Sequence, residues 1–356
     1  MTLTYVKRLG AIGSFKFVLR HRCERPARVT SNFKRVVVLL LFGLLLGWGH
    51  VNRAAAAPLR LGVLGDSMSA GDGSDFGSYP NWVTQLTKSG AFSVSPIGNQ
   101  AVGGAVSTDM VNEQLPAIQA QIQAGQLDYT LVMIGANDAA YAAADFLTNG
   151  NLTGTVQSLV NTVVQNVTFT LNTIAHTGSV HQIVANIPDQ SVAPLVKSLF
   201  TQYHATPAQI AEFKAGIQLA NSEIAAFALR HNIPLIDMFA ATDSIIAHPP
   251  LRLAGVNFTN LFAADGYHPG AVADGLVANA VINAANRQFH AGITPISDQQ
   301  IVRNVGRVPF ILGPTYYNMT PYVLLAVPEP SSWVLAGMGA LGVVIAGSRR
   351  KWLASQ

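Results

Sequence analysis

Leu59-Arg-Leu-Gly-Val-Leu-Gly-Asp-Ser67 is a short apolar run that ends in a glycine and two polar residues. Similar runs recur at residues 129–134, 181–187 and 233–239, and a weaker one lies at 92–97. Between them, apolar residues recur at helical spacing in residues 108–124, 155–175, 207–231 and 270–290. Short apolar strands that alternate with helices are typical of βαβ units. The sequence therefore predicts an α/β fold with three layers, α/β/α, in which helices cover both faces of a mainly parallel sheet.

Charge is distributed unevenly along the chain. The 356 residues carry a formal net charge of +4, and only 11% of them are charged. Residues 1–35 alone hold nine of the 22 Lys and Arg residues, whereas residues 58–326 hold nine basic and sixteen acidic residues, a formal charge of −7. An acidic domain gives no electrostatic support to nucleic-acid binding, so we expect no nucleic-acid partner.

The N-terminal region has the order of a secretory signal peptide. The basic residues 1–35 precede an apolar run, Val36 to Trp48, and the small residues Ala54 to Ala57 follow before Pro58. This order predicts a signal peptide region over residues 1–57. A buried core helix is the alternative, and the uniformly positive flank disfavours it. Cys23, the only cysteine of the chain, lies in this region, so the rest of the protein contains no disulfide.

The C-terminal region begins with Val327-Pro-Glu-Pro-Ser-Ser-Trp333 and continues with an apolar stretch to about Gly347 and a basic Arg349-Arg350-Lys351. Over residues 327–356 it resembles the PEP-CTERM sorting signal. The resemblance implies export machinery and an exosortase as partners, transient membrane anchoring, and a secreted or cell-surface location on a Gram-negative bacterium. The alternative is a permanent anchor, a C-terminal transmembrane helix.

Four short blocks contain residues that could act together in catalysis. They are Gly65-Asp66-Ser67, Asn99 to Ala105 with the pair Gly103-Gly104, Gly135-Ala-Asn137-Asp138, and Asp265-Gly-Tyr-His268-Pro269. The first three follow predicted strands. Because ligands of open α/β sheets bind outside the carboxyl ends of strands, we expect these blocks to border one cleft.

The residue types in these blocks suit acyl transfer. Ser67 can act as a nucleophile once a base takes its proton, His268 is the candidate base, and Asp265 can hold the imidazole ring. The adjacent glycines and the Asn137 amide can donate hydrogen bonds to an oxyanion. Taken singly, each block also has a structural interpretation. Gly65-Asp66-Ser67 is typical of a turn or a helix cap, the glycine pair of a flexible loop, and Asp265 with His268 of a surface histidine beside an acid. Asp138 is interpreted as part of an Asx turn.

Together, in this order, the blocks resemble the GDSL/SGNH hydrolase family, which is named for Ser, Gly, Asn and His residues in such blocks. The resemblance covers roughly residues 59–286 and implies a flavodoxin-like sandwich. Carried over by position, it implies that Ser67 is the nucleophile and that Asp265 and His268 complete the triad. It also implies that Gly104, Asn137 and the Ser67 N–H form the oxyanion hole. Gly104 is preferred to Gly103 because a small residue follows it.

The family pattern is met with one departure, because Met68 stands where the family usually has Leu; the two side chains have similar volumes. The chain contains no Gly-x-Ser-x-Gly elbow and no His-Glu-x-x-His zinc motif. We therefore expect neither a metal nor another cofactor.

The sequence thus predicts an exported serine esterase that hydrolyses lipid, short-chain or carbohydrate O-acyl esters. Two alternatives stay open: a non-catalytic surface or matrix binding protein on the same fold, and an acyltransferase acting on surface polysaccharide. We expect the hydrolase domain over residues 58–290, with 291–326 as an extension that forms a last strand or a linker. Residues 190–215 could shape a substrate lid. The oligomeric state is left open.

Overall fold

The computed structural model describes residues 57–70, 80–149 and 152–326. Its main sheet has the strand order β2-β1-β3-β4-β5-β8 among these residues. The strands are β1 (Leu59–Gly65), β2 (Phe92–Ser93), β3 (Tyr129–Met133), β4 (His181–Ala185), β5 (Leu235–Ile236) and β8 (Val323–Leu324). The first five strands pair in parallel, and β8 pairs antiparallel with β5. This confirms the predicted mainly parallel sheet.

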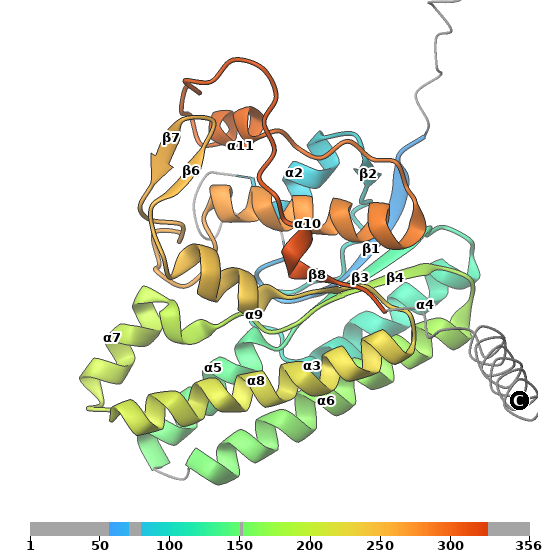
Figure 1. The fold of residues 1–356 in the computed structure, drawn as a ribbon. Helices are drawn as coiled ribbons and strands as arrows, with labels where there is room; N and C mark the ends of the chain where they lie inside the picture. The colour runs from blue at the N-terminus through green and yellow to red at the C-terminus, as the bar shows by residue number, and fades with distance from the viewer. Residues whose placement is uncertain (1–56, 71–79, 150–151, 327–356) are drawn as a thin grey trace, which may run out of the picture. The chain divides into compact units, whose positions relative to one another are not determined.

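Helices cover both faces of this sheet (Figure 1). One face carries α2 (Trp82–Lys88), α10 (Ala271–Phe289) and α11 (Asp298–Asn304). The other carries α3 (Ser107–Asp109), the π-helical turn η2 (Met110–Gln114), α4 (Leu115–Gln123), α5 (Ala136–Asn149), α6 (Leu152–Thr177) and α8 (Pro207–Arg230). Side chains of a strand alternate between the two hydrophobic cores: Leu61 and Val63 pack with the first set of helices, and Leu64 packs with the second. The fold is therefore the predicted three-layer α/β/α sandwich.

Smaller elements lie at the edges of the sandwich. They are the turn η3 (Gln190–Val192), α7 (Pro194–Gln202), α9 (Met238–Ala241), the π-helical turn η4 (Thr242–Ile246), the hairpin β6 (Leu251–Leu253) and β7 (Val256–Phe258), and the turn η5 (Thr320–Tyr322). The strand predicted over 233–239 is shorter than expected. Asp237 ends it because its carboxylate accepts a hydrogen bond from the Ala240 N–H, at 3.0 Å, and so caps α9.

Residues 291–326 pack into the same unit as the rest of the sandwich. Asn279 on α10 exchanges two hydrogen bonds with the backbone of Ile296, of 2.8 and 2.7 Å. Ile301 and Val302 on α11 are fully buried in the first core, and β8 forms the edge of the sheet. The segment for which a strand and a linker were both left open therefore contains that strand. Residues 57–326 hold every packed element described here.

The two predicted targeting regions lie outside the described residues. Within residues 57–70, 80–149 and 152–326, no helix has the length and apolar character needed to span a bilayer. The predicted C-terminal membrane anchor falls in residues 327–356, to which this finding does not extend.

Candidate active site

The end of β1 is locked in place by an amide side chain. The Gly65 N–H donates to the Gln114 side-chain oxygen, at 2.8 Å, and the Gln114 amide donates back to the Gly65 carbonyl, also at 2.8 Å. A side chain at position 65 would not fit, because its Cβ would lie 2.5 Å from the Met133 carbonyl oxygen on β3. This close approach sets the position of the turn that presents Ser67.

The structure brings Ser67, His268 and Asp265 together although about 200 residues separate the serine from the other two. The Ser67 Oγ lies 2.7 Å from His268 Nε2, and His268 Nδ1 lies 2.5 Å from Asp265 Oδ2. The other oxygen of Asp265 accepts hydrogen bonds from the N–H groups of Tyr267 (2.9 Å) and His268 (3.1 Å). The carboxylate is thus fixed by its own loop, and it fixes the imidazole ring in turn.

The electrostatics of Asp265 suit this arrangement. Partial burial alone would raise the pKa of its carboxyl group. The hydrogen bonds from the His268 ring and from the N–H groups of Tyr267 and His268 outweigh that effect, so the pKa lies below its usual value. Asp265 is therefore ionised at neutral pH and can stabilise an imidazolium on His268.

The residues expected to form the oxyanion hole lie on the loop before α3 and at the start of α5. Gly104 has a φ of +81° in an exposed turn, and the Asn137 side-chain amide donates to the carbonyl of the next residue, Ala105, at 3.0 Å. Within the described residues, the N–H groups of Ser67, Gly103 and Gly104 donate to no protein acceptor. These N–H groups and the second N–H of Asn137 are therefore available to a substrate oxygen.

Asp138, predicted to make a local Asx turn, makes a long-range contact instead. Its carboxylate accepts hydrogen bonds from the N–H (2.9 Å) and the hydroxyl (2.7 Å) of Ser107, the first residue of α3. Its role is structural, as expected, but the bond joins α5 to α3 because α5 begins at Ala136, directly before the Asn-Asp pair.

Three polar residues that sequence reasoning had given no role hold the peptide before Asn137. The Ala136 carbonyl accepts hydrogen bonds from Gln190 (2.6 Å) and from the Tyr267 hydroxyl (3.2 Å). The Ala136 N–H lies near the buried carboxylate of Asp66 and lowers its pKa. Asp66 and Tyr267 lie inside the quoted motifs. Gln190 comes from a segment distant in sequence, and no motif marks it.

Burial raises the pKa of the Asp66 carboxyl to about 7, although N–H donors such as that of Met68, 3.0 Å away, oppose the shift. The nearby carboxylate of Asp138 adds to the increase. Burial likewise raises the pKa of the Tyr267 hydroxyl, which stays protonated and donates to Ala136.

A narrow apolar cavity of about 70 Å³ opens beside His268. Its lining includes Met68, Met238, Ile245, Leu276, Val277 and Met319. A second, larger apolar pocket of about 160 Å³ lies between α5 and α7 and shares Gln190 and Tyr267 with the first. The segment 190–215, which the sequence offered as a candidate lid, contributes residues of η3 and α7 to the walls of these pockets.

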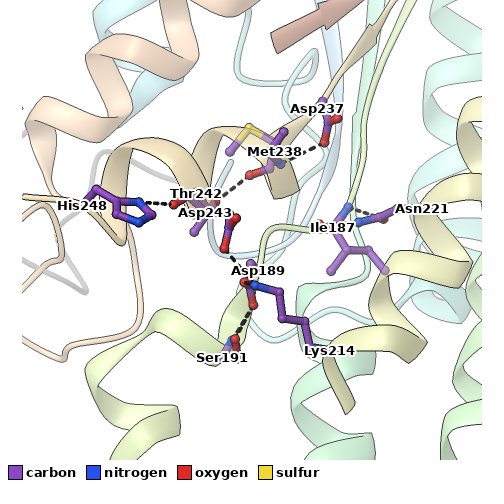
Figure 2. A network of polar contacts seen from close by, with 11 residues as sticks. Ile187, Asp189, Ser191, Lys214, Asn221, Asp237, Met238, Thr242, Asp243 and His248 are labelled. Carbon is purple, nitrogen blue, oxygen red and sulfur yellow. Dashed lines mark hydrogen bonds and ion pairs between the residues drawn. The ribbon is translucent and has the colours of Figure 1, made fainter. Parts of the chain in front are cut away.

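An ion-pair network includes Asp189, which also lines the apolar cavity. Figure 2 shows this network. Lys214 on α8 places its Nζ 2.8 Å from a carboxylate oxygen of Asp189 and 2.8 Å from one of Asp243. The Asp189 side chain is fully buried and that of Asp243 is nearly half exposed. Burial lowers the pKa of Lys214, but its hydrogen bonds to Asp189 and Asp243 outweigh this and raise the pKa overall.

Metal-ligand residues do not cluster at this site or elsewhere in the described part of the chain. Among residues 57–70, 80–149 and 152–326, no group of three or more His, Cys, Asp or Glu side chains is placed to hold an ion.

Three similar solved structures are distant in sequence. LAE5, an alpha/beta hydrolase enzyme from the metagenome of Lake Arreo, Spain, is 18% identical, with a TM-score of 0.45, over 65% of this chain and 96% of that one. Phospholipase A1 from Streptomyces albidoflavus NA297 is 19% identical, with a TM-score of 0.42, over 60% and 93%. Axe2, an acetylxylan esterase from Geobacillus stearothermophilus, is 14% identical, with a TM-score of 0.45, over 67% and 98%. Likeness at this level carries no information on substrate.

Family models match two parts of the sequence, whereas no curated protein matches it. The PEP-CTERM protein-sorting motif matches residues 326–351 and indicates a bacterial protein exported to the cell surface. The model of the GDSL-like Lipase/Acylhydrolase family matches residues 63–273, more than half of the chain, and includes Ser67, Gly104, Asn137, Asp265 and His268. This chain therefore belongs to the GDSL-like lipase/acylhydrolase family.

Proposed function

We propose that this protein hydrolyses carboxylic esters with Ser67 as nucleophile, His268 as general base and Asp265 as the residue that orients the histidine. The 2.7 Å contact between Ser67 Oγ and His268 Nε2 carries the proposal, because it places a base within proton-transfer distance of the hydroxyl. Membership of the GDSL-like family supports ester hydrolysis in general.

The proposed reaction has two halves. In the first, Ser67 Oγ attacks the ester carbonyl carbon while its proton passes to His268 Nε2, and the N–H groups of Ser67, Gly104 and Asn137 stabilise the oxyanion. His268 then gives the proton to the departing alcohol as the acyl-enzyme forms. In the second half, water attacks the acyl carbon while His268 Nε2 takes a proton from it. The bond between the acyl carbon and Ser67 Oγ then breaks, His268 returns the proton to Oγ, and the acid leaves.

The cavity beside His268 supports a preference for esters with an apolar acyl group of short or medium length. Its lining is largely aliphatic, and it lies next to the proposed base. Burial of apolar surface contributes roughly 0.8 kcal/mol for each CH₂ group. Acyl chains that fill the cavity are therefore expected to react faster than acetyl groups on sugars. Comparing kcat/KM for acetyl, butyryl and octanoyl esters tests this preference.

A fluorophosphonate probe tests the nucleophile directly. We expect a single covalent adduct on Ser67, located by peptide mapping, and no adduct after His268→Ala. Ser67→Ala is expected to lower ester turnover by about 10³-fold or more without loss of the folded state. Ser191→Ala, outside the proposed triad, serves as the matched control and is expected to keep the adduct. A folded protein without any adduct would favour the binding-protein alternative.

Export is the setting we propose for this activity. The match to the PEP-CTERM motif supports processing by an exosortase near residue 327 in a Gram-negative host. At the other end, residues 1–57 are basic, then apolar, then small, and this order supports removal of a signal peptide. Intact mass spectrometry of the exported protein checks both ends: recovery of the full 356-residue chain outside the cell would contradict the proposed processing.

A further inference from the structure

The loop that joins α11 to β8 exposes large apolar side chains. Val308, Phe310 and Leu312 are 77%, 79% and 92% exposed, and Ile311 is 43% exposed. Isolated exposed apolar residues are common on protein surfaces, but a contiguous group of them marks a surface that contacts another apolar phase or partner. We call Val308, Phe310, Ile311 and Leu312 the apolar loop.

The apolar loop is held against the tip of the β6–β7 hairpin. The N–H groups of Phe310 and Ile311 both donate to the Ala254 carbonyl, at 3.0 and 3.2 Å. A Cβ on Gly255 would lie 3.0 Å from the Phe310 Cβ, so the two segments are in close contact. The loop arches over α11 beside this hairpin (Figure 1). Its apolar side chains are therefore presented at a defined place, with their backbone anchored.

The surroundings of the apolar loop are basic, although the domain is acidic. Arg252 on β6, Arg303 on α11 and Arg307 at the start of the loop are all exposed, and none forms an ion pair within the described residues. Residues 249–264 and 299–326, which contain the hairpin and the loop, include no Asp or Glu. Three of the nine basic residues of a segment with a formal charge of −7 thus lie on the apolar loop and on the two elements beside it, β6 and α11.

We propose that this patch docks the protein on a membrane surface that carries anionic lipids. Val308, Phe310 and Leu312 enter the interfacial region, and the three arginines contact lipid phosphates. A second copy of this chain fits less well, because a two-fold contact through the same patch would bring two sets of unpaired arginines together. The membrane supplies both properties that the patch demands: an apolar layer and negative charge.

Docking would place the proposed active site close to the bilayer, an extension that rests on the proposed function. β7 leads directly into Leu261 and Phe262, and these two residues line both a surface groove beside Arg307 and the apolar cavity beside His268. The three-residue strands of the hairpin separate its tip from its base by roughly 10 Å. A lipid ester at the membrane surface therefore has a short path to Ser67.

Vesicle flotation tests the docking without any catalysis. We would use residues 57–326, which contain all the helices and strands that the structure describes, with Ser67→Ala, since the substitution prevents hydrolysis of the lipids. Vesicles of phosphatidylcholine alone are compared with vesicles containing phosphatidylglycerol. We expect binding to the anionic vesicles and its loss at high salt, because salt screens the attraction between the arginines and the phosphates.

Two sets of substitutions separate the apolar contribution from the charge. Phe310→Ser with Leu312→Ser is expected to weaken binding at least tenfold. Replacing Arg252, Arg303 and Arg307 by Gln is expected to weaken binding to anionic vesicles by about fivefold for each arginine. Binding to neutral vesicles is expected to stay the same. The matched control is Phe169→Ser with Leu219→Ser, which removes exposed apolar side chains from α6 and α8 on the opposite side of the sheet and is expected to bind as the parent does.

Three outcomes would overturn the docking proposal. One is no binding of the parent protein to anionic vesicles. Another is equal loss of binding in the control variant. The third concerns self-association. If light scattering shows that the parent is a dimer, and the Phe310 and Leu312 substitutions make it a monomer without changing vesicle binding, the patch is a contact between two copies of the chain. Because binding is measured with Ser67→Ala, each of these results is independent of whether the esterase proposal holds.

Discussion

Asp66 is the residue whose chemistry depends most on the fold. The residue is 1% exposed. Its carboxylate accepts a hydrogen bond from the Met68 N–H in the turn after β1, and it lies near the N–H of Ala136, the first residue of α5. The same turn presents Ser67, and the same helix begins with Asn137 as its second residue. The position of Asp66 therefore links the proposed nucleophile to the proposed oxyanion donors.

Asp66→Asn is expected to change how stability depends on pH. The pKa of Asp66 is about 7 in the folded protein and about 3.9 in the unfolded chain, so only the unfolded chain loses this proton between these values. The parent protein therefore loses up to about 4 kcal/mol of stability from this group as the pH rises from 4 to 7. The variant lacks this loss. Urea unfolding at pH 4.5 and pH 7 measures both proteins.

Asp265→Asn provides the contrasting case, because the folded-state pKa of Asp265 is lowered. Its contribution to stability is present above the unfolded value of about 3.9 and is lost as the pH falls through the folded value. The two variants should thus differ from the parent in different pH ranges. If both variants showed the same dependence of stability on pH, burial would not control the pKa of Asp66.

Among the elements, the connection between β3 and α5 depends on a single glycine. Gly135 has a φ of +111°, and a Cβ there would lie 2.9 Å from Ile187. We expect Gly135→Ala to destabilise the protein by roughly 2–3 kcal/mol and to lower turnover, because relief of the clash moves Asn137. Gly125→Ala is the control: its φ is +63° and nothing lies within 4 Å of its Cβ. The control substitution should lower the free energy of unfolding by about 1 kcal/mol and keep full activity. Thermal unfolding and ester assays measure both effects.

Lys214 connects α8 to the loop after β4 and to η4. We expect Lys214→Ala to lower the free energy of unfolding by about 1–3 kcal/mol, since it leaves the buried Asp189 carboxylate without its counter-ion. Asp243→Asn removes the partner that is nearly half exposed and should cost less than about 1 kcal/mol. Chemical denaturation of both variants tests this order. Equal losses would mean that burial of Asp189 does not set the strength of the network.

At the scale of the whole molecule, residues 291–326 complete the fold. Beyond residue 290 the chain supplies five side chains to the first core: Ile296, Ile301, Val302, Met319 and Val323. It also supplies β8, which covers the edge of β5. We propose that the folded hydrolase unit extends to residue 326.

Two truncations test that boundary. Residues 57–326 are expected to unfold cooperatively. The fragment 57–290 is expected to have a free energy of unfolding several kcal/mol lower and to aggregate, because an apolar surface on α10 and an unpaired strand edge become exposed. Circular dichroism melts and light scattering measure the difference. A cooperative, monomeric 57–290 fragment would place the boundary where the sequence alone had suggested.

The sequence by itself predicted the elements whose pattern is local. Buried strands such as 59–64 and 129–134 are continuous apolar runs, and α8 has a proline start and helical spacing over its full length. Short elements were missed for the opposite reason. α2 and α11 have seven residues each, too few for a periodic pattern. The longer α5 was missed because its first residues form the Ala136-Asn137-Asp138 block, which was interpreted as a turn.

The sequence also determined the family and the candidate residues Ser67, Asp265 and His268, because motifs keep their residue types and order. Only the tertiary structure decided which groups these residues contact. The hydrogen bond between Ser67 and His268, the buried Asp66 and the contribution of Gln190 to the Ala136 peptide all join segments distant in sequence. The physical reason is that burial and contact are properties of packed surfaces, which arise only when the strands and helices have been brought together.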